Sequence, residues 1–221
     1  MEGTRLRILQ LLQKHSKENV EGLAREIALA PATIRRHLDI LQRDRLVAFV
    51  EGRKKTGRPE YSYYLTEDGH ESLPKDYDVL LNQVIQELAG LTTEDTIRRD
   101  GRQILELLFE RLAGKLGNEY EQRLQGRDIK YRLVTLMGLL TERDFSPEAQ
   151  VTDGTLELTL LNCPFRSVAL GNDAVCALDA HLISSILHRD VTRDVWIHNG
   201  DAACVYSAPV DGRDTEALDR L

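Results

Sequence analysis

The feature that most constrains the N-terminal fold of this 221-residue chain is a pair of predicted short helices joined by a tight turn. The segment "ENVEGLAREIAL" has apolar residues at the spacing of one helical face, namely Val20, Leu23, Ala24 and Ile27. The segment "APATIRRHLDILQRDRL" follows and opens with Pro31, a residue suited to the first turn of a helix. An earlier stripe in "TRLRILQLLQKH" predicts a third helix that packs against this pair.

The second helix of the pair presents two different faces. Ile34, Leu38 and Leu41 form the stripe that we expect to be buried. Small and basic residues lie off this stripe, near the helix start: Ala32, Thr33, Arg35, Arg36 and His37. This arrangement is typical of a helix-turn-helix whose second helix reads duplex DNA. We therefore predict that Thr33, Arg35, Arg36 and His37 contact DNA.

Two strands with a basic connection follow these helices. "LVAFV" and "EYSYYLT" are rich in β-branched and aromatic residues, and "EGRKKTGRP" joins them. The connection carries four positive charges that we expect at the tip of a hairpin beside the DNA backbone: Arg53, Lys54, Lys55 and Arg58. Residues 1–70 are therefore predicted to form a winged helix-turn-helix domain that binds double-stranded operator DNA.

Charge is unevenly distributed along the chain. Residues 1–64 contain 13 basic and 8 acidic residues, whereas the whole chain has a formal net charge of −7. This asymmetry suggests a basic binding module attached to an acidic body. No apolar run is long enough to cross a bilayer, and the N-terminus lacks the apolar core of a signal peptide. We expect a cytoplasmic protein with no membrane partner.

Residues 71–145 are predicted to be a helical linker and dimerisation region. Strong apolar stripes recur in "YDVLLNQVIQELAGL", in "TIRRDGRQILELLFERLAGKLG" and in the segment up to Phe145. These stripes either cover the C-terminal sheet or pair across a twofold axis, because a homodimer matches the symmetry of its operator. The sequence leaves open which helix forms the dimer.

Residues 146–221 are predicted to form a small α+β sensor domain, which makes the fold class α+β. "GTLELTLLNCPF" alternates as a half-buried strand, and "NDAVCALDAHLISSILHRD" predicts a helix that starts near Asn172 or Asp173. "VWI" and "CVYSA" predict two further strands.

All three cysteines lie in this last region, each at the edge of a predicted element: Cys163, Cys176 and Cys204. Free cysteines are often buried apolar residues, and a redox-sensitive thiol is an alternative. Cys176 falls in the first turn of its helix, where the helix dipole favours a thiolate. Structural zinc usually shows a C-x2–4-C pair, which this sequence lacks. The spacings alone leave iron–sulfur ligation as one alternative among these.

The chain resembles the SufR-type iron–sulfur-responsive repressors in the order and distances of its motifs: "PATIRRHLDILQRDRLV", "GRPEYSYYLTEDG", "NCPF", C-x12-C and "HNGDAACVY". The resemblance implies a repressor of cluster-assembly genes. Its operator affinity depends on an iron–sulfur cluster, 4Fe–4S or alternatively 2Fe–2S, held by Cys163, Cys176 and Cys204. A further cysteine of the family pattern falls here on Asp190. An oxygen or nitrogen ligand there would bind more weakly than sulfur, with Asp190 the first choice and His188 and His198 the rivals.

Two alternative function classes lead to different expectations. A winged-helix repressor that senses a small organic effector or thiol oxidation would carry cysteines that bind no metal. An enzyme is not expected, because the sequence lacks C-x2-C, G-x-S-x-G, G-x4-G-K-[ST] and H-E-x2-H.

Overall fold

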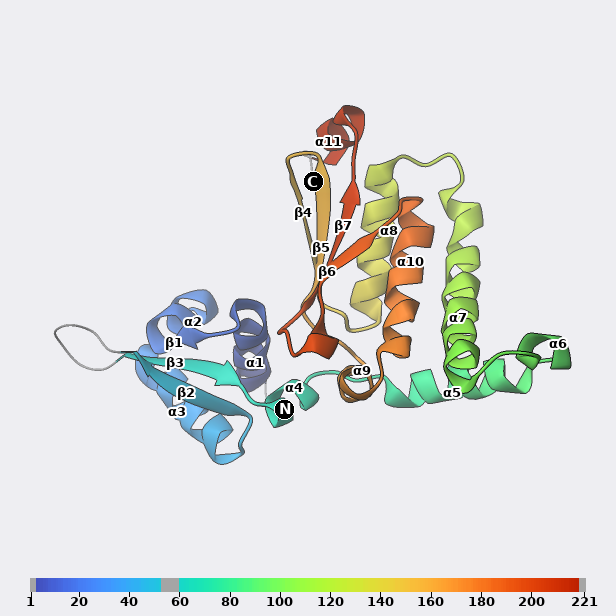
Figure 1. Ribbon diagram of the computed structural model, residues 1–221. Coiled ribbons are helices and arrows are strands. Elements are labelled where there is room, and N and C mark those ends of the chain that lie inside the picture. Colours follow the sequence, from blue (N-terminus) through green and yellow to red (C-terminus); the bar gives the residue numbers. More distant parts are fainter. Residues whose placement is uncertain (1–2, 53–59, 219–221) are drawn as a thin grey trace. The chain divides into compact units, whose positions relative to one another are not determined.

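The computed structural model describes residues 3–52 and 60–218. The chain divides into two compact units, Met1–Pro74 and Lys75–Leu221 (Figure 1). The predicted α+β fold is confirmed: the first unit is a helix-turn-helix with a hairpin, and the second combines helices with an antiparallel sheet. None of the described helices is both long and apolar enough to span a membrane.

The first unit packs its helices against a small antiparallel sheet of order β1-β3-β2. Its elements are α1 (Gly3–His15), β1 (Glu18–Asn19), α2 (Val20–Ile27), α3 (Pro31–Arg43), β2 (Val47–Gly52), β3 (Glu60–Leu65) and α4 (Glu67–Glu71). The predicted stripes form its core, in which Leu23, Ile34 and Leu38 are fully buried. Asn19 joins two elements, since its side chain accepts from the Gly22 N–H at 2.8 Å and donates to Glu60 Oε1 at 2.8 Å.

The turn after the hairpin depends on a close backbone approach at Gly69. Thr66 Oγ1 donates to the Arg45 carbonyl at 2.6 Å and accepts from the Gly69 N–H at 3.0 Å, which caps α4. A Cβ on residue 69 would lie 2.0 Å from the carbonyl oxygen of Leu46. Real Cβ atoms do not approach backbone oxygen so closely, so only glycine fits here.

The second unit contains a four-stranded antiparallel sheet of order β4-β5-β7-β6. Its helices are α5 (Tyr77–Ala89), α6 (Thr93–Thr96), α7 (Gly101–Leu124), α8 (Ile129–Glu142), α9 (Arg166–Gly171), α10 (Ala177–Leu187) and α11 (Gly212–Leu218). Its strands are β4 (Pro147–Thr152), β5 (Thr155–Leu160), β6 (Thr192–Val195) and β7 (Cys204–Pro209), and its 3-10 turns are η1 (Asp173–Cys176) and η2 (Ile197–Asn199).

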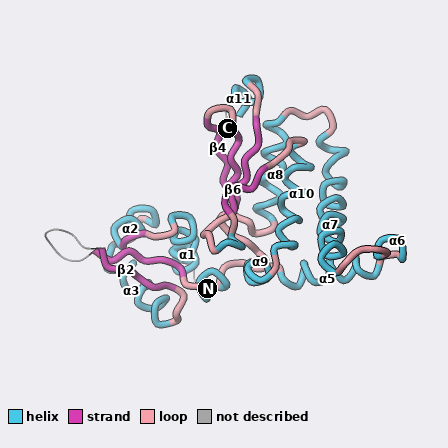
Figure 2. Tube along the Cα trace, in the orientation of Figure 1, coloured by secondary structure: helices cyan, strands magenta, loops and turns pink. Residues whose placement is uncertain are grey.

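This unit is built in layers. Figures 1 and 2 show α8 and α10 lying against the sheet, with α7 on the far side of α10. Leu156, Leu158 and Leu160 alternate toward the buried face, as their period of two predicts. Gly117 allows α7 to approach α10 closely, because a Cβ there would lie 2.4 Å from Ser185 Oγ.

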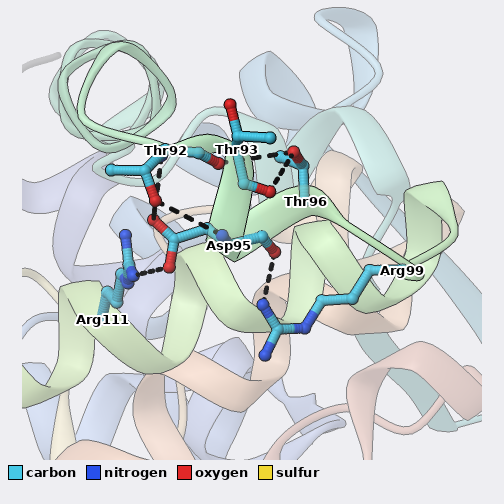
Figure 3. Close-up of polar contacts among 6 residues, drawn as sticks. All are labelled: Thr92, Thr93, Asp95, Thr96, Arg99 and Arg111. Carbon is cyan, nitrogen blue, oxygen red and sulfur yellow. Dashed lines mark hydrogen bonds and ion pairs between the residues drawn. The ribbon is translucent and has the colours of Figure 1, made fainter.

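The short helix α6 fixes the connection between α5 and α7 (Figure 3). Thr92 and Asp95 form a capping box, in which Asp95 Oδ2 accepts from the Thr92 N–H at 2.9 Å. Asp95 also forms an ion pair with Arg111 of α7. The Thr92 backbone hydrogen bond, followed by Arg111, holds the pKa of Asp95 below its ordinary value.

The structure differs from the expected elements in several places. Strand β4 and helix α9 were not anticipated, and "VWI" is not a strand, because β6 ends at Val195 and η2 begins at Ile197. The residues of the predicted helical region and of the predicted sensor domain share one hydrophobic core within the second unit. They do so because α7 buries its apolar face against α10 rather than forming a separate body.

We predict that Gly69→Ala destabilises the first unit by about 1–3 kcal/mol, the usual cost of overpacking. The Leu46 carbonyl oxygen is part of the backbone and has little freedom to move away. Urea unfolding followed by circular dichroism measures the change. Gly3→Ala is the matched control, since a Cβ at residue 3 meets nothing within 4 Å. Equal unfolding midpoints for the two variants would contradict the argument.

Candidate functional site

The first candidate site is the exposed face of α3. The αL conformation of Ala28 ends α2, and α3 starts at Pro31, so the two helices are joined by a three-residue turn. Thr33, Arg35 and Arg36 are exposed, while the opposite stripe is buried. Arg35 Nη2 lies 2.9 Å from Glu21 Oε1 of α2. Arg36 forms no ion pair with another described residue, which leaves its guanidinium available to DNA.

His37 lies at the edge of this face. It is half-buried, and its Nδ1 is a buried atom for which the described residues offer no hydrogen-bond partner. The predicted contacts Arg53, Lys54, Lys55 and Arg58 lie outside the described residues. The strands β2 and β3 that lead to them pair in register from Val47↔Leu65 to Gly52↔Glu60.

The second candidate site surrounds the first turn of α10. Cys163 follows β5, Cys176 is the N-cap residue of α10, and Cys204 begins β7 opposite Leu160. Cys176 and Cys204 are buried, Cys163 is half-buried, and all three are free thiols. Cys163 and Cys176 line one cavity of about 10 Å³ together with Asp179, Phe145 and Phe165.

The electrostatics of these thiols are set by burial. Burial raises the pKa of Cys176 to about 11 and that of Cys204 to about 12, and it raises the pKa of Cys163 further still. The charge of Asp179 is the next cause in each case. Desolvation of Cys176 therefore opposes the thiolate that the helix dipole favours.

Asp179 is the common neighbour of the thiols, and the sequence analysis missed it. Its Oδ2 accepts from the Tyr206 hydroxyl at 2.7 Å, and burial raises its pKa. Arg193 donates from Nε to the Tyr206 oxygen at 2.9 Å and lies over the Trp196 ring at 4.7 Å. A signal was present in the sequence: Asp179 falls on the apolar stripe of α10, where a solvated carboxylate is not expected.

The structure does not bring the predicted fourth ligand to the cysteines. Asp190 and His188 are exposed beyond the C-terminal end of α10, whereas Cys176 lies at its N-terminal end (Figure 1). His198 is closer to the N-terminal end, but its Nδ1 lies 2.7 Å from the Ala169 carbonyl oxygen. Across residues 3–52 and 60–218, no group of three His, Cys, Asp or Glu side chains converges as the ligands of one metal ion would.

Comparison with known proteins addresses the first site. Residues 2–48, which span α1 to the start of β2, match the family model described as "Bacterial regulatory protein, arsR family". The first unit is a winged helix-turn-helix DNA-binding domain. The protein is accordingly a DNA-binding transcriptional regulator and not an enzyme.

Two further comparisons used the whole chain. A crystal structure of Bacillus subtilis PadR in complex with operator DNA aligns with 85% of this chain and 99% of that chain, at 18% identity and a TM-score of 0.31. The search of curated proteins gives no match.

We predict that Arg36→Ala weakens binding to a duplex selected from a random library by about 1–3 kcal/mol, the contribution of a side chain that reads a base edge. The first turns of the recognition helix in such domains contact the bases. Arg43→Ala, at the opposite end of α3, is the matched control and should cost less. Fluorescence anisotropy at constant salt measures both, and an equal loss for the two variants would count against α3 as the reading helix.

Proposed function

We propose that this regulator senses an iron–sulfur cluster held by Cys163, Cys176 and Cys204, and that the cluster controls its affinity for operator DNA. The observation that supports the proposal most is the desolvation of three thiols around one buried carboxylate. Four acidic groups in one dry site retain protons unless a cation compensates them. The resemblance to SufR-type repressors supports the same assignment and suggests cluster-assembly genes as the targets.

The donor set fits an iron–sulfur cluster better than a single ion. Thiolates are the usual ligands of iron–sulfur clusters, and the ligands of a cubane bind different irons and so lie further apart than those of one ion. A cluster supplies redox-sensitive and oxygen-sensitive occupancy. Asp179 Oδ1, a buried atom that lacks a hydrogen-bond partner among the described residues, also suits a positively charged core.

Hydrogen bonds hold the loop that carries Cys163 to the first residues of the second unit. These bonds suggest how cluster binding changes the DNA-binding domain. The Asp76 N–H donates to the Pro164 carbonyl at 3.2 Å, and Lys75 Nζ donates to Asn162 Oδ1 at 3.2 Å. The Ser167 N–H donates to the Tyr77 hydroxyl oxygen at 3.0 Å. Lys75 directly follows the first unit, which ends at Pro74.

Because the cavity beside Cys163 is small, we infer that the loop carrying Cys163 moves when a cluster binds. A space of about 10 Å³ holds no more than one water molecule. Residues 162–167 therefore adopt different positions in the loaded and the empty chain, and residues 75–77 follow them through the three hydrogen bonds. Such linkage typically changes affinity by about 1–3 kcal/mol, or about 5–150-fold.

We predict that replacing any one of the three cysteines with serine lowers the iron and acid-labile sulfide content of protein purified without oxygen. Each variant should also bind operator DNA with the affinity of cluster-free wild-type protein, which differs about 5–150-fold from that of the loaded protein. Metal analysis, visible absorbance and anisotropy measure these effects. Full iron content and an unchanged operator response in all three variants would refute the proposal.

A second candidate function is supported by an apolar groove of about 270 Å³ in the second unit. It is lined by α5, α7, α9 and η1, and includes Leu80, Phe109 and Val175. This volume is just below the range of about 300–1,000 Å³ typical of small-molecule sites. An organic effector would be favoured by protein that is colourless when made without oxygen and yet binds operator DNA tightly.

We also propose that the regulator is a homodimer that pairs through α5. Leu81, Ile85 and Leu88 recur at helical spacing and are 60%, 53% and 54% exposed. A second copy of the chain is the occupant that suits this face, because helix-turn-helix proteins read two half-sites with twofold symmetry. The remaining side of α5 packs against α7 through Leu80 and is not available.

We predict that the double variant Leu81→Glu/Ile85→Glu is monomeric in analytical ultracentrifugation and binds operator DNA at least about tenfold more weakly, since burying each side chain contributes about 1.5–3 kcal/mol. Val134→Glu, at an apolar position of α8 that is 51% exposed, is the matched control and should remain dimeric. A dimeric double variant would show that another surface forms the dimer.

A further inference from the structure

The core-facing side of the β2–β3 hairpin continues beyond the hydrophobic core as an exposed aromatic surface. Residues that pair directly across two strands have their side chains on the same side of the sheet, and the buried pair Val47↔Leu65 marks the side that faces the core. Phe49 and Tyr63 form the next pair on this side, and Tyr61 lies two residues before Tyr63 on β3. Phe49 and Tyr61 are 41% and 42% exposed.

Contacts between the rings hold Tyr61 in a defined position. The ring centroids of Phe49 and Tyr61 are 4.8 Å apart and the ring planes meet at 77°, the edge-to-face arrangement that aromatic pairs favour. Phe49 also contacts Tyr63, with centroids 5.8 Å apart, and Tyr63 packs against the core of the first unit. The Tyr61 hydroxyl forms no hydrogen bond with another described residue. Its ring is therefore fixed while its hydroxyl stays available to a ligand.

This aromatic surface adjoins the reading helix. Burial raises the pKa of Tyr63, and the charges of Asp39 and Arg35 also act on it, which places Tyr63 close to α3. Arg35 belongs to the exposed face of α3. Beyond Gly52 and Tyr61 the two strands lead to the segment "GRKKTGRP", which carries four basic residues in the sequence. Phe49 and Tyr61 thus lie between the face of α3 and the strand ends that lead to this basic segment.

We propose that the Tyr61 hydroxyl donates a hydrogen bond to a phosphate oxygen of operator DNA, and that Phe49 is the positioning residue that holds the Tyr61 ring. Tyrosine is among the side chains that bond to DNA phosphates, and such contacts fix the register of a protein on the duplex without reading bases. The pair therefore adds an uncharged backbone contact beside the base contacts of α3. This inference rests on DNA binding by the first unit and does not depend on cluster sensing.

The test compares Tyr61→Phe with Val50→Ala in the full-length protein. Val50 is 41% exposed, as Phe49 is, but it lies on the opposite side of the hairpin. Fluorescence anisotropy measures the affinity for a duplex selected from a random library and for an unrelated duplex. We expect Tyr61→Phe to weaken both complexes equally, by about 3–10-fold, the usual effect of one lost hydrogen bond.

Salt dependence distinguishes this contact from that of a basic residue. The slope of log affinity against log salt should be the same for Tyr61→Phe and the wild type, because a neutral hydroxyl releases no counterion. Val50→Ala should bind both duplexes within about twofold of the wild type, as exposed substitutions usually do. Circular dichroism checks that each variant folds. Wild-type affinity in Tyr61→Phe would overturn the proposal and favour a protein partner for this surface, and an equal loss in Val50→Ala would also overturn it.

The positioning role of Phe49 has its own test. Phe49→Leu keeps an apolar side chain against Tyr63 but removes the ring that contacts Tyr61. We expect it to weaken binding, and we expect the double variant Phe49→Leu/Tyr61→Phe to bind no more weakly than Tyr61→Phe, because Phe49 acts through the hydroxyl. Losses that multiply in the double variant would overturn this role.

Glu51 gives an independent test of where the phosphate lies. It pairs directly with Tyr61, on the same side of the hairpin. A carboxylate there repels a phosphate bound at Tyr61, so Glu51→Gln should bind DNA more tightly, by about twofold to fivefold at low salt. Asp44→Asn, at the C-cap of α3, removes the same charge elsewhere in the first unit and should have a smaller effect. Equal effects in the two variants would contradict a phosphate beside Tyr61.

Discussion

The burial of four acidic groups around the first turn of α10 is the constraint on which the second unit depends. Three thiols and the Asp179 carboxyl share this dry region, and burial raises the pKa of each. The positive charge of Arg193 lowers the pKa values of Cys176, Cys204, Asp179 and Tyr206, but burial outweighs it in each case. A protein gains nothing in stability from such an arrangement, because desolvated acids cost free energy unless they are compensated. We therefore interpret it as a binding site for a positively charged group.

In our account, the cysteine site affects DNA binding because of where it lies in the chain. Cys163 lies on a loop whose carbonyl and amide groups hold residues 75–77, immediately after the winged-helix domain. A change in the loop reaches this segment through hydrogen bonds, without a long chain of contacts. The same segment leads into α5, whose exposed apolar side we assign to the dimer. In our proposal, this short stretch of chain connects the cysteine loop to the surface that we assign to the dimer.

The sequence was most informative where structure is determined locally. The stripes of α2 and α3 are helical repeats within a few residues, and they predicted both the buried face and the exposed Arg35 and Arg36. Prediction from sequence was weakest for side chains whose neighbours come from distant parts of the chain. Asp179 accepts a hydrogen bond from Tyr206 of β7 and lies near Arg193 of β6, so its neighbours cannot be read from the local sequence. For the same reason, the raised pKa of Cys176 could not be predicted from its place at a helix start.

Iron K-edge X-ray absorption spectroscopy of wild-type protein purified without oxygen tests the central claim most directly. The account predicts iron surrounded mainly by sulfur, with other iron atoms in the next shell. Protein without iron, or iron surrounded only by oxygen and nitrogen with no iron neighbour, would contradict it.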